Sequence, residues 1–350
     1  MSGVRVVQWT TGIVGASALR AILDDPRLEL VGVFAHGPAK VGQDAGALAG
    51  RPPTGIAATD DVQALLDLRP DCAVYMPHWP DIALMERILR AGVNVVTTAR
   101  LVNGEHYPED AGARLRAAAI AGGVTLVGTG MNPMYVPSLA IAATAMCRNV
   151  QRIHIHESLD CVGYASAPMW VGYGFGGPPD ADALYDTFQR AEPDYRETLD
   201  EMARAVGLAL DDITLTVACG VAVADRDLGF MTIAAGTVSG VDLVWTGWCQ
   251  GNEVAVLRTT WTLGSAMGHK QDPEWPIFYG YKIRVDGDPN VRLKLAFIPS
   301  DLATFDIGTT TAMPAVNAIT SVVAAPPGVL SVAELPLVRA RGVVEPVASP

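Results

Sequence analysis

Apolar residues in the first part of the chain form short continuous runs, separated by segments in which they recur every three or four positions. Short apolar runs rich in β-branched residues predict buried strands, and the longer period predicts amphipathic helices. Strands are expected at residues 4–9, 28–35, 72–77, 92–99 and 124–127, and helices at 16–23, 60–66, 82–91 and 108–121. This alternation predicts an α/β fold with a Rossmann-type, doubly wound parallel sheet.

The pattern changes from residue 151 onwards, where most strands follow one another with little helix between them. An alternating strand at 152–157 and a loop at 163–179 precede two helical stretches within 181–208. Further strands are expected at residues 213–223, 230–237, 241–250, 253–263, 277–285 and 292–298, and a final helix at 311–319. This order predicts a C-terminal α+β domain with an open, mixed or antiparallel sheet.

The first strand ends in a glycine turn that leads into the first helix. The turn reads Thr10-Thr11-Gly12-Ile13-Val14-Gly15, with Thr10 where the first glycine of G-x-G-x-x-G usually stands. Gly12 lets the backbone approach a pyrophosphate, Gly15 lets the helix pack on the strand, and the free N–H groups of the helix start face the anion. The turn predicts a dinucleotide site, although a βα turn without a ligand would also carry one or two glycines.

The end of the second strand indicates which dinucleotide is bound. In a site specific for NAD, an Asp or Glu here holds the ribose 2′-hydroxyl. This chain has Ala35-His36-Gly37-Pro38 instead, followed by Lys40. The missing acid and the nearby cation favour a 2′-phosphate, hence NADP(H), with NAD(H) as the alternative. The alternative interpretation is that His36 and Lys40 are ordinary loop residues that bind no ligand.

Ligands of such a sheet lie at the carboxyl ends of the strands, so the loops at that edge supply the candidate site residues. The predicted cofactor-binding residues are Thr10, Thr11, Gly12, Ile13, Val14, His36, Lys40, Pro77, Thr98, Ala99, Arg100 and Asn132. The predicted substrate-pocket residues are Met134, Tyr135, Trp170, Tyr173 and Phe175. The last three are interleaved with glycines. They are expected either to form an aromatic wall or lid over the pocket, or to pack at an interface.

Glu105 is the first candidate for a catalytic residue. It follows Gly104 in a loop that we expect to lie beside the nicotinamide. A carboxylate there could stabilise a cationic iminium and shuttle protons. Glu109 is the second candidate, since it follows Pro108 at an expected helix start, where an acid commonly interacts with the helix dipole. The alternative interpretation of Glu105 is a solvated loop acid.

The same patterns divide the chain into three parts. We expect a dinucleotide-binding domain at residues 1–133 and a domain for substrate binding and dimerisation at 134–310. Residues 311–350 are expected to form a helix and tail that pack back on the first domain. An open sheet often buries one face against a second subunit, so a homodimer is predicted.

Composition excludes several kinds of partner. The 350 residues are 50% hydrophobic and 18% charged, as in a compact globular protein, and the net charge of −12 argues against nucleic acid and anionic membranes. A small neutral or cationic substrate fits better. The five cysteines show no C-x-x-C spacing and no signal peptide is recognised, so we expect a reduced, cytoplasmic protein. The uncharged run 307–332 contains several prolines and is not expected to span a membrane.

Two other kinds of chemistry find little support in the sequence. His154 and His156 share one face of a strand beside Glu157, but no third converging ligand is visible, so no metal site is predicted. The chain also has no G-x-S-x-G motif, which argues against a serine hydrolase.

Three motifs together resemble the dihydrodipicolinate reductase-like superfamily. They are Gly12-Ile13-Val14-Gly15, the segment 41–50 and Gly128-Thr129-Gly130-Met131-Asn132-Pro133. Within the superfamily the chain is most similar to 2,4-diaminopentanoate dehydrogenase and the native amine dehydrogenases. The likeness covers most of the chain, including residues 275–289 and 317–336. His154-Ile155-His156-Glu157, with no lysine after it, argues against dihydrodipicolinate reductase itself.

The resemblance implies an NAD(P)H-dependent amine dehydrogenase. Such an enzyme joins ammonia to a ketone or aldehyde and reduces the resulting iminium to a primary amine, or runs the reverse oxidative deamination. The family uses one glutamate from the loop after the fifth strand, and Glu105 occupies the corresponding loop, with Glu109 as the alternative. Other functions left open are a carbonyl or imine reductase, a 2,4-diaminopentanoate-type amino acid dehydrogenase, and a non-catalytic redox sensor that binds NADP.

Overall fold

The computed structural model describes residues 3–264, 277–298 and 306–340, and the chain forms two compact units. The first unit comprises Met1–Ser138 and Asp306–Pro350, and the second comprises Leu139–Phe305. Both ends of the sequence therefore belong to the same unit. Residues 275–276 of the family resemblance and residues 341–350 of the predicted tail lie outside the described residues.

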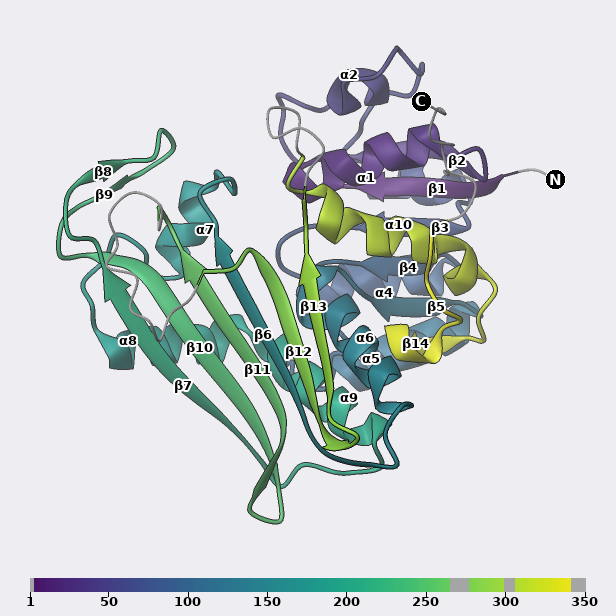
Figure 1. Ribbon diagram of the computed structural model, residues 1–350. Coiled ribbons are helices and arrows are strands. Elements are labelled where there is room, and N and C mark those ends of the chain that lie inside the picture. Colours follow the sequence, from purple (N-terminus) through teal and green to yellow (C-terminus); the bar gives the residue numbers. More distant parts are fainter. Residues whose placement is uncertain (1–2, 265–276, 299–305, 341–350) are drawn as a thin grey trace, which may run out of the picture. The chain divides into compact units, whose positions relative to one another are not determined.

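The first unit is built on a six-stranded parallel sheet (Figure 1). Its strands in spatial order are β14 (Gly328–Leu330), β5 (Thr125–Gly128), β4 (Asn94–Thr97), β3 (Cys72–Tyr75), β1 (Val4–Trp9) and β2 (Leu28–Phe34). Every neighbouring pair is parallel. The Rossmann-type sheet predicted from the sequence is confirmed, and β14 adds a sixth strand that the sequence pattern did not predict.

Helices cover both faces of this sheet and bury two separate apolar cores. One core contains residues of α1 (Ile13–Asp24), α2 (Ala45–Ala49) and α10 (Thr309–Val323). The other contains residues of α3 (Val62–Asp67), α4 (Ile82–Arg90) and α5 (Ala111–Gly122). The strands between them are buried on both faces, which explains why they are continuously apolar in the sequence.

The starts of three helices follow from local chemistry. Asp61 caps α3 by accepting hydrogen bonds from the second and third amides of the helix, and Asp81 caps α4 in a similar way. The helix expected from residue 108 begins instead at Ala111, because Glu109 and Asp110 have φ angles of +58° and +52°. A left-handed backbone cannot continue a right-handed helix, so the predicted start was wrong by three residues.

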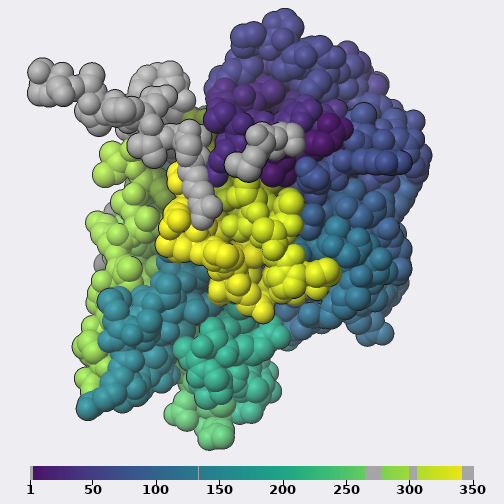
Figure 2. Space-filling view, turned by 90° about the vertical axis from the view of Figure 1, so that its right-hand side faces the viewer, coloured from purple at the N-terminus to yellow at the C-terminus, as the bar shows by residue number. Residues whose placement is uncertain are grey.

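The helix expected at residues 311–319 is the core of α10, which extends from Thr309 to Val323 and packs along α1. Pro314 lies inside it and is buried. Figure 2 shows the tail residues, in yellow, directly beside the purple N-terminal residues. The last part of the chain thus completes the sheet through β14 and one helical layer through α10.

The second unit contains a six-stranded mixed sheet with helices against one face (Figure 1). Its order is β13 (Val291–Ala296), β12 (Gly280–Asp288), β6 (Asn149–Asp160), β11 (Asn252–Thr262), β10 (Val238–Cys249) and β7 (Asp212–Val221). The pair β6 and β11 is parallel, and the other pairs are antiparallel. The predicted α+β domain with a mixed sheet is therefore confirmed.

Among the described residues, the second unit contains α7 (Ala167–Gly172), α8 (Ala181–Ala191), α9 (Pro193–Ala205) and the greater part of α6 (Val136–Thr144). Residues 230–237 do not form the long strand that was predicted. They contain only β9 (Thr232–Ile233), which pairs with β8 (Arg226–Asp227) in a separate hairpin. Pairing ends at a turn in which the Thr237 amide donates to the Ala234 carbonyl, with Gly236 at φ +78°. None of the described helices is both long enough and apolar enough to cross a membrane.

Candidate functional site

The turn between β1 and α1 has a shape that two of its residues determine. Thr10 has φ +74°, so a threonine holds the left-handed position that the first glycine of the fingerprint usually takes. A Cβ at Gly15 would lie 2.4 Å from the Thr10 carbonyl oxygen, so only glycine fits there. The Gln8 side chain also donates to the Thr10 carbonyl at 3.0 Å and holds this peptide in place.

The start of α1 fits a diphosphate. A Cβ at Gly12 would meet nothing within 4 Å, so the space in front of the turn is open. No acceptor among the described residues pairs with the backbone amides of Ile13 and Val14, the first residues of the helix. The Lys40 Nζ lies 2.6 Å from the Thr11 carbonyl oxygen and adds a cation to the turn. Free amides, a helix start and a nearby cation together attract an anion.

Lys40 and His36, the two residues predicted to bind a 2′-phosphate, have different surroundings in the loop after β2. Lys40 reaches back to the glycine turn, so the structure brings two predicted cofactor residues, Lys40 and Thr11, together. His36 is exposed, and its ring packs edge-on against Phe34 at 4.8 Å between centroids. Phe34 in turn stacks on Trp9 at 4.6 Å, so the base of this loop is rigid.

A cluster of ring and cationic side chains forms where β3 and β4 end, next to the predicted residues Pro77 and Arg100. The His78 ring packs edge-on against Trp79 at 4.7 Å, and the Arg100 guanidinium lies 5.9 Å from the Trp79 ring. Burial, together with the charge of Arg100, lowers the pKa of His78 to about 4. His78 is therefore neutral at physiological pH. The sequence placed these loops at the ligand edge but did not predict the cluster.

The loops after β4 and β5 approach each other at the predicted residue Thr98. The Thr98 Cγ2 atom lies 3.6 Å from where a Cβ of Gly130 would be. The Ala99 amide donates to Thr97 Oγ1 at 2.9 Å, and the Arg100 amide donates to the Thr98 carbonyl at 3.0 Å. Asn132 and Met134 follow in the π-helical turn Met131–Tyr135.

Glu105 lies in the same loop as Thr98, on a backbone fixed by close packing. Gly104, with φ +82°, accepts hydrogen bonds from the amides of Tyr107 and Gly112 at 3.2 and 3.0 Å. A Cβ at Gly104 would lie 2.9 Å from the Gly112 nitrogen, so this contact with the first turn of α5 requires glycine. The Glu105 amide donates to Asn103 Oδ1 at 2.9 Å. The glutamate is thus held on a rigid turn.

The two candidate carboxylates differ in their surroundings. The Glu105 side chain is 41% exposed and lies 4.0 Å from the Arg116 guanidinium. The Glu109 side chain is 82% exposed and pairs with Arg114 at 3.4 Å. Glu109 also lies two residues before α5, outside the first turn of the helix.

The loop of Glu105 follows β4, the fourth strand, whereas the family resemblance placed it after the fifth. The strand number in the prediction was therefore wrong.

The residues predicted for the substrate pocket are divided between the two units. Met134 and Tyr135 belong to the first unit, where the Tyr135 hydroxyl donates to the Val338 carbonyl at 3.1 Å. Trp170, Tyr173 and Phe175 are buried in the second unit. The Trp170 and Phe175 rings lie 5.1 Å apart, and the Trp170 indole donates to the Tyr164 carbonyl at 2.7 Å. These three aromatic residues form a packed cluster with the rings of Phe188 and Trp261.

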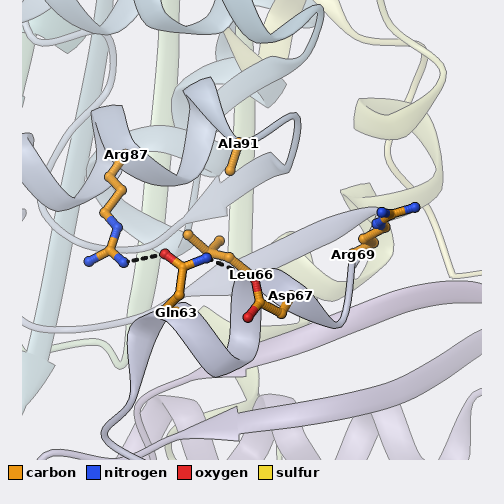
Figure 3. Close-up of a pocket in the computed structure, with 6 residues that line it drawn as sticks. All are labelled: Gln63, Leu66, Asp67, Arg69, Arg87 and Ala91. Carbon is orange, nitrogen blue, oxygen red and sulfur yellow. Dashed lines mark hydrogen bonds between the residues drawn. The ribbon is translucent and has the colours of Figure 1, made fainter.

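A hollow of about 520 Å³ lies between α3 and α4 (Figure 3). Three of its polar side chains are hydrogen-bonded to one another. Gln63 accepts a hydrogen bond from Arg87 at 2.7 Å and donates one to Asp67 at 2.8 Å. None of the predicted cofactor or substrate residues lines this hollow.

His154 and His156 lie on the sheet of the second unit among cations. Burial and the neighbouring Arg284 lower the pKa of His154 to about 4, and burial with Arg258 lowers that of His156 to about 3. The His156 ring nitrogen Nε2 is hydrogen-bonded to Thr260 Oγ1 at 2.9 Å. No group of three potential metal ligands occurs among the residues that the structure describes.

Comparison with known protein families identifies the family of this chain. The model of the 2,4-diaminopentanoate dehydrogenase C-terminal domain matches residues 134–345, more than half of the chain. The chain belongs to the 2,4-diaminopentanoate dehydrogenase family. The family predicted from the sequence motifs is thereby confirmed.

Two relatives match this family member along nearly its whole length. An amine dehydrogenase from Streptomyces virginiae is 29% identical over 359 residues, covering 97% of this chain and 98% of the relative. The structure of the amine dehydrogenase from Mycobacterium smegmatis has a TM-score of 0.79 at 25% identity, covering 97% of this chain and 98% of that one. Together the comparisons support the predicted enzyme class, an NAD(P)-dependent oxidoreductase acting on amines.

A more distant structure shares the fold. The WlbA dehydrogenase from Bordetella pertussis, solved with NADH and UDP-GlcNAcA, has a TM-score of 0.54 at 13% identity and covers 92% of this chain and 88% of that one. The arrangement of a parallel sheet followed by a mixed sheet is therefore not restricted to the amine dehydrogenases.

Proposed function

We propose that this protein is an NADP(H)-preferring amine dehydrogenase, which interconverts a ketone or aldehyde plus ammonia with a primary amine. The observation that carries the proposal is the match to amine dehydrogenases through both units of the chain. The first unit supplies an edge suited to a dinucleotide, and a carboxylate stands in a loop at the same edge. In this proposal the first unit binds the cofactor and the second is the substrate-binding domain.

The residues around the glycine turn fit the diphosphate of a nicotinamide dinucleotide. The amides of Ile13 and Val14 would hold it in front of Gly12, where the structure leaves open space. Thr98 and Arg100 would line the nicotinamide side of the edge, since they follow β4. When bound, the dinucleotide supplies or accepts the hydride.

In the proposed reaction Glu105 transfers protons and stabilises a positively charged intermediate. Its carboxylate takes a proton from the nitrogen that has added to the carbonyl and passes it to the former carbonyl oxygen, which gives a carbinolamine. With a second proton, which comes from solvent through the same carboxyl group, the hydroxyl leaves as water and a cationic iminium remains. The ionised carboxylate then stabilises the cationic iminium. At about 4 Å, a pair of unit charges attracts by about 4 kcal/mol at an effective dielectric constant near 20. The close packing at Gly104 fixes the backbone from which the Glu105 side chain extends.

The preference for NADP(H) rests on charge at the end of β2. The strand ends at Phe34 and is followed by Ala35 and His36, so it carries no acid to hold a ribose 2′-hydroxyl. Lys40, six residues after this strand, is the cation proposed to pair with a 2′-phosphate, and its Nζ contacts the Thr11 carbonyl in the structure. The ratio of NADPH to NADH affinity measures this preference directly.

The second unit is proposed to form a homodimer through the sheet face opposite α9. Side chains alternate along a strand, so Trp245 and Thr259 face the helices while Val244 and Arg258 face the other side. That other face contains a hollow of about 250 Å³ lined by Arg152, His154, Val244, Thr246, Glu253, Val256, Arg258 and Arg284. A second copy would cover this surface symmetrically.

A cytoplasmic location is proposed from the cysteines. All five are free thiols, and burial raises the pKa of Cys72 to about 12. Such thiols persist in a reducing compartment.

The function is tested by NADPH oxidation with a panel of ketones and aldehydes, in the presence and absence of ammonia. The proposal predicts turnover that requires ammonia and yields a primary amine. Turnover without ammonia would instead indicate a carbonyl reductase. Activity confined to 2,4-diaminopentanoate and its oxo product would indicate the amino acid dehydrogenase. NADPH binding without any turnover would indicate a redox sensor.

A further inference from the structure

Asp306, which precedes α10, is the hub of a polar cluster on α1. Its carboxylate accepts a hydrogen bond from Ser17 Oγ at 2.6 Å, another from the Arg20 guanidinium, and a third from the Gly308 amide at 3.1 Å. Its carbonyl accepts the Thr309 amide at 3.0 Å. One residue thus joins the beginning of α10 to α1, across 289 positions of sequence.

The contact next to Asp306 is close enough to fix the first turn of α1. A Cβ at Gly308 would lie 2.4 Å from Ser17 Oγ and 2.7 Å from the Ile13 carbonyl oxygen. Gly308 is therefore packed directly against the turn whose amides face the predicted diphosphate. Ser17 also lies 3.0 Å from the Ile13 carbonyl, so the cluster reaches the first residue of the helix.

The same helix start also touches the opposite side of the predicted cofactor site. The Thr311 Cγ2 atom lies 3.4 Å from where a Cβ of Gly130 would be, and Thr98 Cγ2 lies 3.6 Å from that position. Gly130 follows β5 and Thr98 follows β4. The beginning of α10 is thus packed between the glycine turn and the loops on the nicotinamide side.

The cluster is built to stay ionised. Burial would raise the pKa of Asp306, but the hydrogen bonds from Ser17 and Arg20 outweigh it and hold the pKa below its ordinary value. The side chains of Arg20 and Asp306 are 30% and 29% exposed. A charged pair at this depth is oriented by its hydrogen bonds and responds to the loss of either partner.

We propose that Asp306 is a positioning residue for the dinucleotide, and that it sets cofactor affinity by holding the first turn of α1 in register with Thr98 and Gly130. It acts through Ser17, Arg20 and Gly308 and does not touch the cofactor. The inference rests on the proposed function, because it takes the ligand of this edge to be a nicotinamide dinucleotide.

The test is the dissociation constant of NADPH, measured by fluorescence titration for the wild type and for Asp306→Asn. Asparagine keeps the size of the side chain but loses the charge that holds Arg20. We expect the dissociation constant to rise about tenfold, the size of effect given by losing a charged hydrogen bond. In steady-state assays, KM for NADPH is expected to rise in parallel, while kcat at saturation stays within about twofold.

The matched control is Arg51→Met. Arg51 pairs with Asp24, the last residue of α1, at 2.6 Å, so this variant breaks an ion pair on the same helix at the end far from the glycine turn. Its NADPH affinity is expected to equal that of the wild type. Arg20→Lys keeps the charge and is expected to retain affinity, whereas Arg20→Met is expected to lose it as Asp306→Asn does.

The outcomes separate this inference from the proposed function. If the wild type binds no nicotinamide dinucleotide, the proposed function and the inference both fail. If the wild type binds NADPH and folded Asp306→Asn binds it equally well, only the positioning role is overturned. A lower melting temperature with unchanged affinity would show that the cluster serves stability alone.

Discussion

Thr10, Gly12 and Gly15 show how single residues shape the cofactor edge. Gly15 must be glycine because a Cβ there would collide with the Thr10 carbonyl. Gly12 has an ordinary φ of −71° and open space beside it, so its backbone does not require glycine. The absence of a side chain at Gly12 matters only when a ligand occupies that space.

This difference predicts opposite behaviour of two alanine variants. Gly12→Ala is expected to keep its stability within about 0.5 kcal/mol, because alanine fits the backbone, but to bind NADPH about tenfold more weakly. Gly15→Ala is expected to lose about 1–3 kcal/mol of stability through overpacking. Urea unfolding and NADPH titration of both variants measure the two effects. A Gly12→Ala variant with undiminished affinity would mean that no diphosphate lies in front of the turn.

The sequence was informative about residues whose role is local. The glycine turn could be predicted because strand, turn and helix are neighbours along the chain, whereas the contact of Lys40 with the Thr11 carbonyl, 29 positions away, was not predicted. The cluster of Asp306 with Ser17 and Arg20 could not, because its members are separated by most of the sequence and each is an ordinary polar residue. Tyr135 is a similar case, since its hydroxyl pairs with the distant Val338 carbonyl.

At the scale of helices and strands, the periodicity of apolar residues predicted most elements, whereas it could not predict which short segments form strands by pairing with a neighbour. The buried strands of the parallel sheet were predicted because both faces are covered and the runs are continuously apolar. The three residues of β14 have no such pattern and form a strand only by pairing with β5. Residues 230–237 show the opposite case. Their composition favours a long strand, but a turn at Ala234–Thr237 ends the strand after Ile233.

The strand β6 leads to a prediction about pH. The unfolded pKa of a histidine is about 6.5, whereas burial and the nearby Arg284, Arg152 and Arg258 lower the pKa of His154 in the fold to about 4. Below pH 6.5 the unfolded chain therefore binds a proton that the folded chain does not, so stability falls as the pH drops towards 4.

His154→Gln removes this titration. Between pH 7.5 and pH 5 the wild type is expected to lose on the order of 2 kcal/mol more stability than the variant. Urea unfolding at the two pH values provides the measurement. Equal losses in both proteins would show that His154 does not remain neutral in the folded state.

At the scale of the whole molecule, the account predicts a second copy of the chain on the sheet of the second unit. Val244 lies on the proposed contact face beside three arginines, so Val244→Lys adds a like charge to it. We expect a dimeric wild type and a monomeric Val244→Lys in sedimentation velocity. Val223→Lys, at a valine that is 62% exposed, is the control and should remain dimeric. A wild type that sediments as a monomer would contradict the assembly.

The order of units was predictable from sequence, because a run of alternating strands and helices precedes a run of strands. The only sequence signal that the C-terminal tail packs on the first unit was the apolar helix predicted at residues 311–319. Its contacts with α1 and with the loops after β4 and β5 depend on the folded molecule, and they now account for the surroundings of the proposed cofactor site.

The central claim is that Glu105 makes reductive amination possible at this edge. The most direct measurement compares Glu105→Ala with Glu109→Ala, an acid four residues away in the same segment, in ammonia-dependent NADPH oxidation and in NADPH binding. Glu105→Ala is expected to lose about 10²–10⁴-fold in kcat, the usual contribution of a positioned acid or base, while binding NADPH normally. Glu109→Ala is expected to resemble the wild type. Intact activity in Glu105→Ala would contradict the account.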